Sequence, residues 1–377
     1  MSLEKTSRIQ FFKSQQVLII QDSNAIELRH TVFLTSCRIN EVGLFVWQHL
    51  EQSQSLEMLC SKVVRQYDVI PEIASSTIKN LLEQLHGLGF MSVQYANLPQ
   101  DPMRQRYLEL LQKALMNLLY PEHELRIRHL LQSEKPASSL ETDRLMRDIR
   151  MTQPEQYAEI MSCKQIGGVL YNEATRYSHT AIGIRRLENL QACAEAVFAD
   201  GIKGDFLEAG VCQGGASIFM RALQVAYGQA ERQMWVADSF AGLPVPTADL
   251  DVQSQLDWSE PRQPWLAISL ETVQEHFRRY EMLSNSVHFL QGWFADTLHQ
   301  APIQQLSILR LDADLFGSTT EILEALYERV ASGGFIIVDD YAGIQACREA
   351  INQYRAKNNV LEPIRQVDWS CVYWRKA

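Results

Sequence analysis

The chain has 377 residues, of which 46% are hydrophobic and 21% charged, and its formal net charge is −10. These values are typical of a globular protein of about two domains, and the negative charge disfavours non-specific binding to nucleic acid or to anionic membranes. There is no apolar run of membrane-spanning length and no signal peptide at the start, so we expect neither a membrane segment nor secretion. The seven cysteines are scattered and contain no CxxC, so we expect a reduced, cytoplasmic protein without a disulfide framework or zinc site.

The first 97 residues predict a small domain of short strands and three helices. Residues 16–20 and 25–28 are strand candidates on either side of the polar turn Asp22-Ser23-Asn24. Apolar residues at helical spacing then predict three helices, and a short apolar run predicts a closing strand. The helices are expected at 41–50, after Asn40 as N-cap, at 56–64 and at 73–88, and the strand at 90–93. This order predicts a winged-helix-like α+β domain.

Winged helices often bind DNA, but residues 1–97 carry 8 Lys or Arg against 9 Asp or Glu and no basic cluster. The runs NEVGLFVWQHL, LEMLCSKVVRQYDV and LLEQLHGLGF resemble PqqD-like domains, which recognise precursor peptides. That resemblance implies that a leader peptide adds as a strand beside residues 17–20 and 28–33 and packs on the helix at 75–86. A purely structural or dimerising role is the alternative.

The Pro-rich polar run at 97–102 marks the boundary before a second domain at 103–377. An amphipathic helix is expected at 104–119 and another at 187–198, and residues 177–183 between them are candidates to fold over a ligand. Residues 244–264 are acidic and Pro-rich, as in insertions that form lids over a substrate.

A Gly-rich turn follows the first predicted strand of this domain, within the run DFLEAGVCQGGAS at 205–217. Its spacing differs from the dinucleotide pattern GxGxxG, and it has no P-loop lysine, so phosphate is not the obvious ligand. Glycines let the backbone approach a ligand closely, and Glu208 is suited to meet an ammonium group unless it is an ordinary strand-end carboxylate. The candidate contacts in this turn are Glu208, Gly210, Gly214 and Ser217.

The next predicted strand, at 234–237, ends in Asp238-Ser239, and an acidic residue there suits the two hydroxyls of a ribose. A cofactor with a ribose and a cationic amino-acid end is S-adenosylmethionine. A later strand closes with FLQGWFADTL, in which Trp293 and Phe294 are candidates to flank an adenine, although aromatic residues at such positions are more often core.

Residues 307–341 predict a strand, a helix at 319–330 and a second strand at 335–338, with Ser332-Gly333-Gly334 ending the helix. The two strands end in Asp312-Ala313-Asp314 and in Asp339-Asp340. Ligands of parallel α/β sheets lie at the carboxyl ends of the strands, where four carboxylates would repel one another without a cation. An all-oxygen set favours Mg²⁺, then Mn²⁺ or Ca²⁺. The alternative is that these residues are helix N-caps and loop carboxylates.

From about residue 103 to the end, the chain resembles the macrocin O-methyltransferase (TylF/MycF) family. The motifs that carry the resemblance are RYLELLQKALMNLLYP, HTAIG, LEAGVCQGGA, VADSFAGLP, FLQGWFADTL, LRLDADLFGST, GGFIIVDDY and DWSCVYWR. The family implies Mg²⁺-assisted transfer of a methyl group from S-adenosylmethionine to a hydroxyl. Two departures are Cys212-Gln213, where Trp-Arg is common, and Ala181, where Met is usual.

The resemblance also implies roles by position. Asp314 would be the general base. The metal ligands would be Asp312, Asp339 and Asp340, and the cofactor would be held by Glu208, Gly210, Asp238, Ser239 and Asp296.

We therefore expect an α/β protein with a Rossmann-like class I methyltransferase fold, a doubly wound and mostly parallel sheet, after a winged-helix-like domain at 1–97. The expected acceptor is a hydroxyl of a ribosomally made peptide recruited through its leader. The alternatives are a sugar hydroxyl of a glycosylated small molecule, with a structural first domain, and a non-catalytic binding protein. A homo-oligomer is expected, with neither nucleic acid nor membrane as partner.

Overall fold

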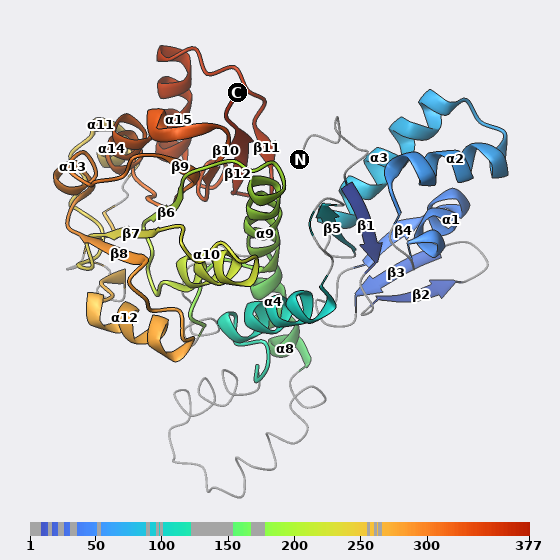
Figure 1. Ribbon diagram of the computed structural model, residues 1–377, viewed down its shortest axis with the longest axis horizontal. Coiled ribbons are helices and arrows are strands. Elements are labelled where there is room, and N and C mark those ends of the chain that lie inside the picture. Colours follow the sequence, from blue (N-terminus) through green and yellow to red (C-terminus); the bar gives the residue numbers. More distant parts are fainter. Residues whose placement is uncertain are drawn as a thin grey trace, which may run out of the picture. The chain divides into compact units, whose positions relative to one another are not determined.

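A computed structural model gives the fold (Figure 1). It describes residues 9–13, 17–21, 26–30, 36–50, 54–87, 91–95, 98, 101–121, 154–166, 178–254, 257–259, 262 and 266–377. The chain divides into two compact units, Met1–Asp101 with Pro121–Gln165, and Pro102–Tyr120 with Ile166–Ala377. The domain limits that we infer from the sequence, 1–97 and 103–377, stay a proposal. None of the helices in these described ranges has the length and apolar character needed to cross a membrane.

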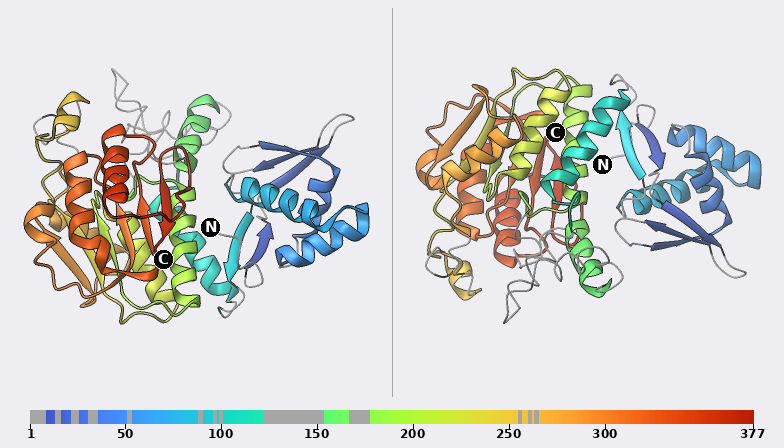
Figure 2. Two further views of the ribbon diagram at one scale, coloured as in Figure 1. Left: turned by 90° about the horizontal axis from the view of Figure 1, so that it is seen from above. Right: turned by 90° about the horizontal axis from the view of Figure 1, so that it is seen from below.

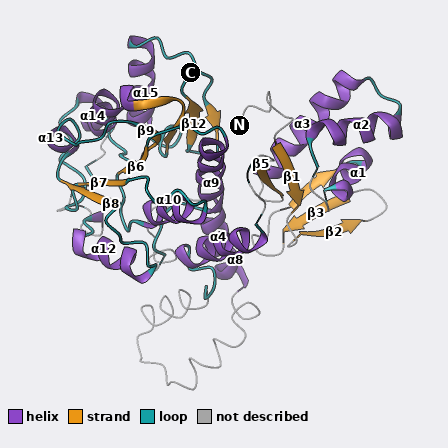
Figure 3. Cartoon of the chain, in the orientation of Figure 1, coloured by secondary structure: helices purple, strands orange, loops and turns teal. Residues whose placement is uncertain are grey.

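The first unit contains a small antiparallel sheet and three helices (Figure 3). The sheet has the order β2 (Val17–Gln21), β3 (Ile26–His30) and β4 (Ser36–Ile39), and the helices are α1 (Glu41–His49), α2 (Leu56–Tyr67) and α3 (Pro71–Gly87). A separate pair joins β1 (Ile9–Lys13) to β5 (Met91–Tyr95), and α8 (Pro154–Ile166) follows later in the chain. The winged-helix-like α+β architecture is confirmed. The strands β1 and β4 have no counterpart in our expectation.

Local signals explain where these helices begin and end. The side chain of Asn40 accepts a hydrogen bond from the Gly43 N–H at 2.8 Å and caps α1, as predicted. Ser55 caps α2 in the same way, and Asp68, with φ of 49°, ends it in the left-handed region. The apolar faces of the three helices then enclose a core that includes Trp47 and Ile78.

A seven-stranded sheet forms the centre of the second unit, in the order β11-β12-β10-β9-β6-β7-β8. Five strands, β10, β9, β6, β7 and β8, run parallel to one another. The strand β12 is antiparallel to both β10 and β11. The strands are β6 (Asp205–Ala209), β7 (Met234–Asp238), β8 (Val287–Gln291), β9 (Leu306–Leu311), β10 (Val330–Val338), β11 (Arg365–Gln366) and β12 (Val372–Arg375). This doubly wound, mostly parallel sheet is the predicted methyltransferase architecture.

Helices cover both faces of this sheet (Figure 2). The helices are α4 (Pro102–Leu115), α9 (Ile184–Ala199), α10 (Gly215–Ala226), α11 (Asp249–Gln253), α12 (Leu270–Arg279), α13 (Phe294–Thr297), α14 (Phe316–Leu326) and α15 (Gln345–Lys357). Leu207 and Leu309 pack with α14 and α15 in one core. Because strand side chains alternate, Glu208 and Arg310 project to the opposite face, toward α9 and α10.

Two predicted helix ends are wrong. The helix expected at 104–119 is α4, which ends at Leu115. The helix expected at 319–330 is α14, which ends at Leu326 and is followed by a 3₁₀ turn at Tyr327–Arg329. Val330 already belongs to β10 and lies opposite Leu306, and the pairing shifts before Phe335. Ser332-Gly333-Gly334 therefore lies in an irregularity of the strand, where Gly333 has a φ of 83°, instead of ending the helix.

Candidate active site

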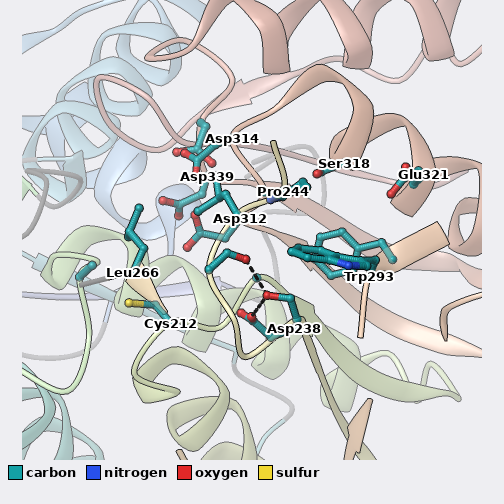
Figure 4. A pocket seen from close by; sticks show the side chains of 18 of the residues that line it. Cys212, Asp238, Pro244, Leu266, Trp293, Asp312, Asp314, Ser318, Glu321 and Asp339 are labelled. Atoms are coloured by element: carbon teal, nitrogen blue, oxygen red, sulfur yellow. Dashed lines mark hydrogen bonds between the residues drawn. The ribbon is translucent and has the colours of Figure 1, made fainter. Parts of the chain in front are cut away.

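A cavity of about 320 Å³ opens at the carboxyl ends of the parallel strands (Figure 4). The strand register explains how its walls come together. Ala209 lies opposite both Ala237 and Leu311, and Leu311 lies opposite Val338. The residues that follow these strand ends are therefore neighbours, and Gly210, Asp238, Asp312 and Asp339 all line the cavity. Ligands of open α/β sheets bind in this position.

Gly210 allows the backbone after β6 to pack directly against the backbone after β9. Its φ is +84°, and a Cβ built on it would lie 1.7 Å from the carbonyl oxygen of Asp312. Asp312 in turn donates its backbone N–H to the Ala209 oxygen at 2.8 Å. Only glycine fits where the turn after β6 meets the turn after β9.

Three aspartates converge at one end of the cavity. One carboxylate oxygen of each of Asp312, Asp339 and Asp340 lies within 4.8 Å of the others. Asp339 and Asp340 reach the same point because β10 ends at Val338 and the chain turns. In the part of the chain that the structure describes, Asp340 Oδ2 is buried and has no hydrogen-bond partner. Burial and the neighbouring aspartates raise the pKa of Asp340 well above its usual value.

Asp314 lies beside this group and lines the same cavity (Figure 4). Its φ of 57° is in the left-handed region, which is uncommon for a residue other than glycine. Burial, with Asp312 and Asp339 nearby, raises the pKa of Asp314 to about 8. Such a carboxylate exchanges a proton near neutral pH.

Two buried arginines lie under the aspartates. Arg310 of β9 donates to Glu208 at 2.5 Å, to Asp312 at 2.9 Å and to Asp339. Arg186 of α9 donates to the other oxygen of Asp339 and, at 2.7 Å, to Asp368. Asp339 is thus held by both of its oxygens. Our sequence reasoning missed both arginines and Asp368; a charged residue inside the apolar run LRL was the signal available for Arg310.

The predicted cofactor residues divide into two groups. Those that line the cavity are Gly210, Asp238, Ser239, Trp293 and Phe294. Asp238 accepts hydrogen bonds from the Val211 N–H at 2.7 Å and the Phe240 N–H at 2.8 Å, so it also fixes the two turns. Trp293 is 41% exposed, which leaves its ring available to a ligand.

The structure does not bring Glu208, Gly214, Ser217 or Asp296 to the lining of this cavity. Glu208 is 1% exposed; it pairs with Arg310 and accepts a hydrogen bond from the Ser217 hydroxyl. Burial raises the pKa of Glu208 to about 7, against the opposing effect of Arg310. Glu208 therefore takes part in the buried charge network.

The donor set fits a hard divalent cation. All the convergent ligand atoms are carboxylate oxygens, Asp340 has a buried oxygen without a partner, and the aspartates and Glu208 outnumber the two arginines. The cavity also fits a nucleoside-type ligand, because it combines a glycine turn, an acidic strand end and an exposed indole ring.

This fold and this cavity are those of the class I methyltransferases, and comparison with known proteins defines the family. The model of the family macrocin-O-methyltransferase (TylF) matches residues 104–376, and the model of coenzyme PQQ synthesis protein D (PqqD) matches residues 34–91. The chain belongs to the TylF family and carries a PqqD-like region before it.

Characterised relatives agree with this assignment. Over 198 residues the chain is 48% identical to 8-demethyl-8-(2,3-dimethoxy-alpha-L-rhamnosyl)-tetracenomycin-C 4'-O-methyltransferase of Streptomyces olivaceus, covering 52% of this chain and 76% of that protein. It is 45% identical over 204 residues to mycinamicin III 3''-O-methyltransferase of Micromonospora griseorubida, covering 53% of this chain and 79% of that protein. The solved O-methyltransferase NovP matches with a TM-score of 0.58 and 35% identity, covering 73% of this chain and 99% of NovP. The protein is an S-adenosylmethionine-dependent O-methyltransferase.

Proposed function

We propose that this enzyme methylates a sugar hydroxyl of a glycosylated small molecule. The observation that carries the proposal is the similarity of the catalytic part to enzymes whose names place the methyl group on such compounds, one of them bearing a rhamnosyl group. The cavity supports it, because Leu243, Pro244 and Leu266 add apolar lining beside the aspartates. An acceptor with a polar sugar on an apolar body matches that lining.

Asp312, Asp339 and Asp340 would hold a divalent cation, Mg²⁺ first and Mn²⁺ second. When bound, such a cation supplies positive charge that lowers the pKa of a nearby hydroxyl. The two arginines would keep Asp339 oriented while the unpartnered oxygen of Asp340 completes the set.

Asp314 would accept the proton of the acceptor hydroxyl at its carboxylate. S-adenosylmethionine supplies the methyl group, which leaves a neutral thioether behind. The turn after β6 and the ring of Trp293 would keep the donor next to Asp314, and the apolar wall would exclude water that competes for it.

The test combines acceptors with variants. The full chain is incubated with S-adenosylmethionine and a panel of glycosides, each paired with its deoxy analogue, and methylation is followed by mass spectrometry. Methylation of a glycoside and not of its deoxy analogue supports the proposal. Asp314→Asn should lower kcat by about 100-fold with little change in S-adenosylmethionine affinity. Full turnover by this variant would remove Asp314 from the mechanism.

The cation is tested separately by binding. Mn²⁺ binding to the full chain, followed by electron paramagnetic resonance, should weaken at least about tenfold in Asp340→Asn. Chelation should abolish turnover, and Mg²⁺ should restore it. Unchanged Mn²⁺ affinity in the variant would show that the aspartates serve another purpose.

The PqqD-like region favours a second candidate, a peptide acceptor recruited through its leader. Among the described strands β2 has a free edge, with Leu18, Ile19 and Ile20 all exposed. The expectation that residues 28–33 also receive the peptide needs correction for 28 and 29, because this part of β3 is paired on both sides; 31–33 lie outside the described residues. An edge strand with unpaired backbone groups is suited to adding a peptide strand.

Leader binding is measured on the full chain with labelled precursor peptides encoded beside the gene. Ile19→Lys on β2 should weaken binding at least about tenfold, while Met58→Lys on α2 of the same unit, which is similarly exposed, should not. If no leader binds, the peptide candidate is rejected and the sugar acceptor remains.

A further inference from the structure

Asp251 of α11 caps a helix to which it does not belong. Its side chain is buried, with 2% of the residue exposed. Oδ1 accepts a hydrogen bond from the Phe316 N–H at 2.7 Å, and Oδ2 accepts one from the Gly317 N–H at 3.2 Å. The N-cap residue of α14 is Leu315, whose side chain cannot accept. Asp251 supplies the acceptors that the start of α14 lacks.

The capped turn follows directly after Asp314. Asp314 has a positive φ, the Leu315 N–H bonds the Ala313 oxygen at 2.5 Å, and α14 begins two residues after Asp314. A residue other than glycine keeps such a backbone only when its surroundings fix it. The carboxylate of Asp251 fixes the backbone on the C-terminal side of Asp314.

The same carboxylate ties down the segment that forms part of the cavity wall. Leu243 and Pro244, just before α11, line the cavity, and Leu243 pairs with Ser259 beyond it. The N–H groups of Phe316 and Gly317 hold the Asp251 carboxylate. Two donors at the positive end of a helix offset the cost of burying this side chain.

We propose that Asp251 is a positioning residue that sets the geometry of Asp314 and couples it to the wall on which the acceptor lies. This inference rests on the proposed role of Asp314 as the base. Asp251 acts through the first turn of α14 and touches neither the donor nor the acceptor.

The first test compares two substitutions on the same helix in the full chain. Asp251→Asn keeps the shape of the side chain but replaces one accepting oxygen with an NH₂ group, which cannot accept a hydrogen bond from a backbone N–H. It should lower kcat by about tenfold or more, with the dissociation constant of S-adenosylmethionine unchanged within about twofold. Asp249→Asn makes the same charge change at an exposed position and should keep the parent rate. Equal rates in both variants would overturn the proposal.

A double variant separates positioning from a merely structural role. If Asp251 acts through Asp314, Asp251→Asn should cause no further loss of kcat in an Asp314→Asn background. Losses that multiply would overturn the proposal. Full rate in Asp314→Asn alone would instead reject the proposed role of Asp314 as the base, a different outcome.

Thermal unfolding and S-adenosylmethionine binding check that the variants are folded. If Asp251→Asn does not fold, Asp251→Glu replaces it, because it keeps the charge and moves the carboxylate by one methylene. We expect Asp251→Glu to lose several-fold in kcat with intact donor binding. A folded Asp251→Glu enzyme with full kcat would show that Asp251 serves stability alone.

Discussion

Arg310 and Arg186 together contact four carboxylates beneath the candidate site, and both side chains are almost fully buried. Buried ion pairs add little stability relative to apolar packing, because both charges lose their water. Removing one partner is different, because it leaves a buried charge without compensation. The arginines therefore matter as a group that holds the side chains of Glu208, Asp312 and Asp339 in place.

Arg310→Met should destabilise the protein by about 3–5 kcal/mol, because Glu208 loses its buried partner and Asp339 loses one of its two. Urea unfolding measures the change. Arg278→Met, on the exposed face of α12, should change stability by less than about 1 kcal/mol. Adding Glu208→Gln to Arg310→Met should recover part of the loss, and a purely additive result would contradict the charge explanation.

Gly210→Ala should abolish S-adenosylmethionine binding, since its Cβ would lie 1.7 Å from the Asp312 oxygen. Gly201→Ala is the matched control: Gly201 has a φ of +66° but nothing within 4 Å of its Cβ. It should cost only about 1 kcal/mol from backbone strain. Calorimetric binding and thermal unfolding of both variants test this, and normal binding by Gly210→Ala would contradict the close approach.

At the scale of elements, the segment at 178–182 is held between helices. The His179 ring stacks on His276 with centroids 4.3 Å apart, and its Nδ1 lies 2.8 Å from the Tyr280 hydroxyl. Gly215 packs against the His179 carbonyl oxygen, where a Cβ would come within 2.2 Å. Ala181 and Ile182, which follow, line the cavity. This arrangement fits the expectation that 177–183 folds over a ligand, although 177 lies outside the described residues.

The stability of the protein should depend on pH through His179. Burial, with His276 and Arg279 nearby, lowers the pKa of His179 from 6.5 to about 4. The unfolded chain binds this proton more tightly, so the contribution is complete above about pH 6.5 and is lost as the pH falls toward 4. The loss is well below about 3 kcal/mol, because His179 is only partly buried and solvent screens its charge. As the pH is lowered from about 6.5 to 4, the urea midpoint of His179→Asn should fall less than that of the parent protein. An equal fall in both proteins would contradict the assignment to His179.

Local patterns predicted most elements, and contacts between distant residues account for what they missed. The acidic pairs after β9 and β10 were predictable because each follows an apolar run, and parallel strands place such ends together. The ion pair between Glu208 and Arg310 could not be predicted in this way, because it depends on the register of β6 against β9. The cap from Asp251 to α14 joins residues 65 positions apart and leaves no local signal.

At the scale of the whole molecule, the chain joins two compact units, each with its own hydrophobic core. The residues that line the cavity belong to the second unit alone, and the TylF match covers nearly all of that unit together with residues 121–165 of the first. The PqqD match lies within the first. Donor binding at this cavity and leader binding at β2, both as proposed, would therefore be properties of different units.

S-adenosylmethionine should stabilise the second unit selectively. At about 100 times its dissociation constant, a ligand that binds only the folded state adds about 2.7 kcal/mol. Hydrogen exchange followed by mass spectrometry should show slower exchange in β6, β7 and β9 and no change in α1, α2 and α3. Equal protection in both units would contradict the independence of their cores.

The contact of Gly210 with Asp312 also has a consequence for how the enzyme is made. These two residues are about a hundred positions apart, and they meet only when β6 pairs with β9 across the sheet. Loop-closure entropy makes such non-local parallel pairing slow. On the ribosome, a chain that has been synthesised only as far as α12 therefore lacks one wall of the donor site. We therefore expect methyl-donor binding at the proposed site to become available late, after β9 has emerged and joined the sheet.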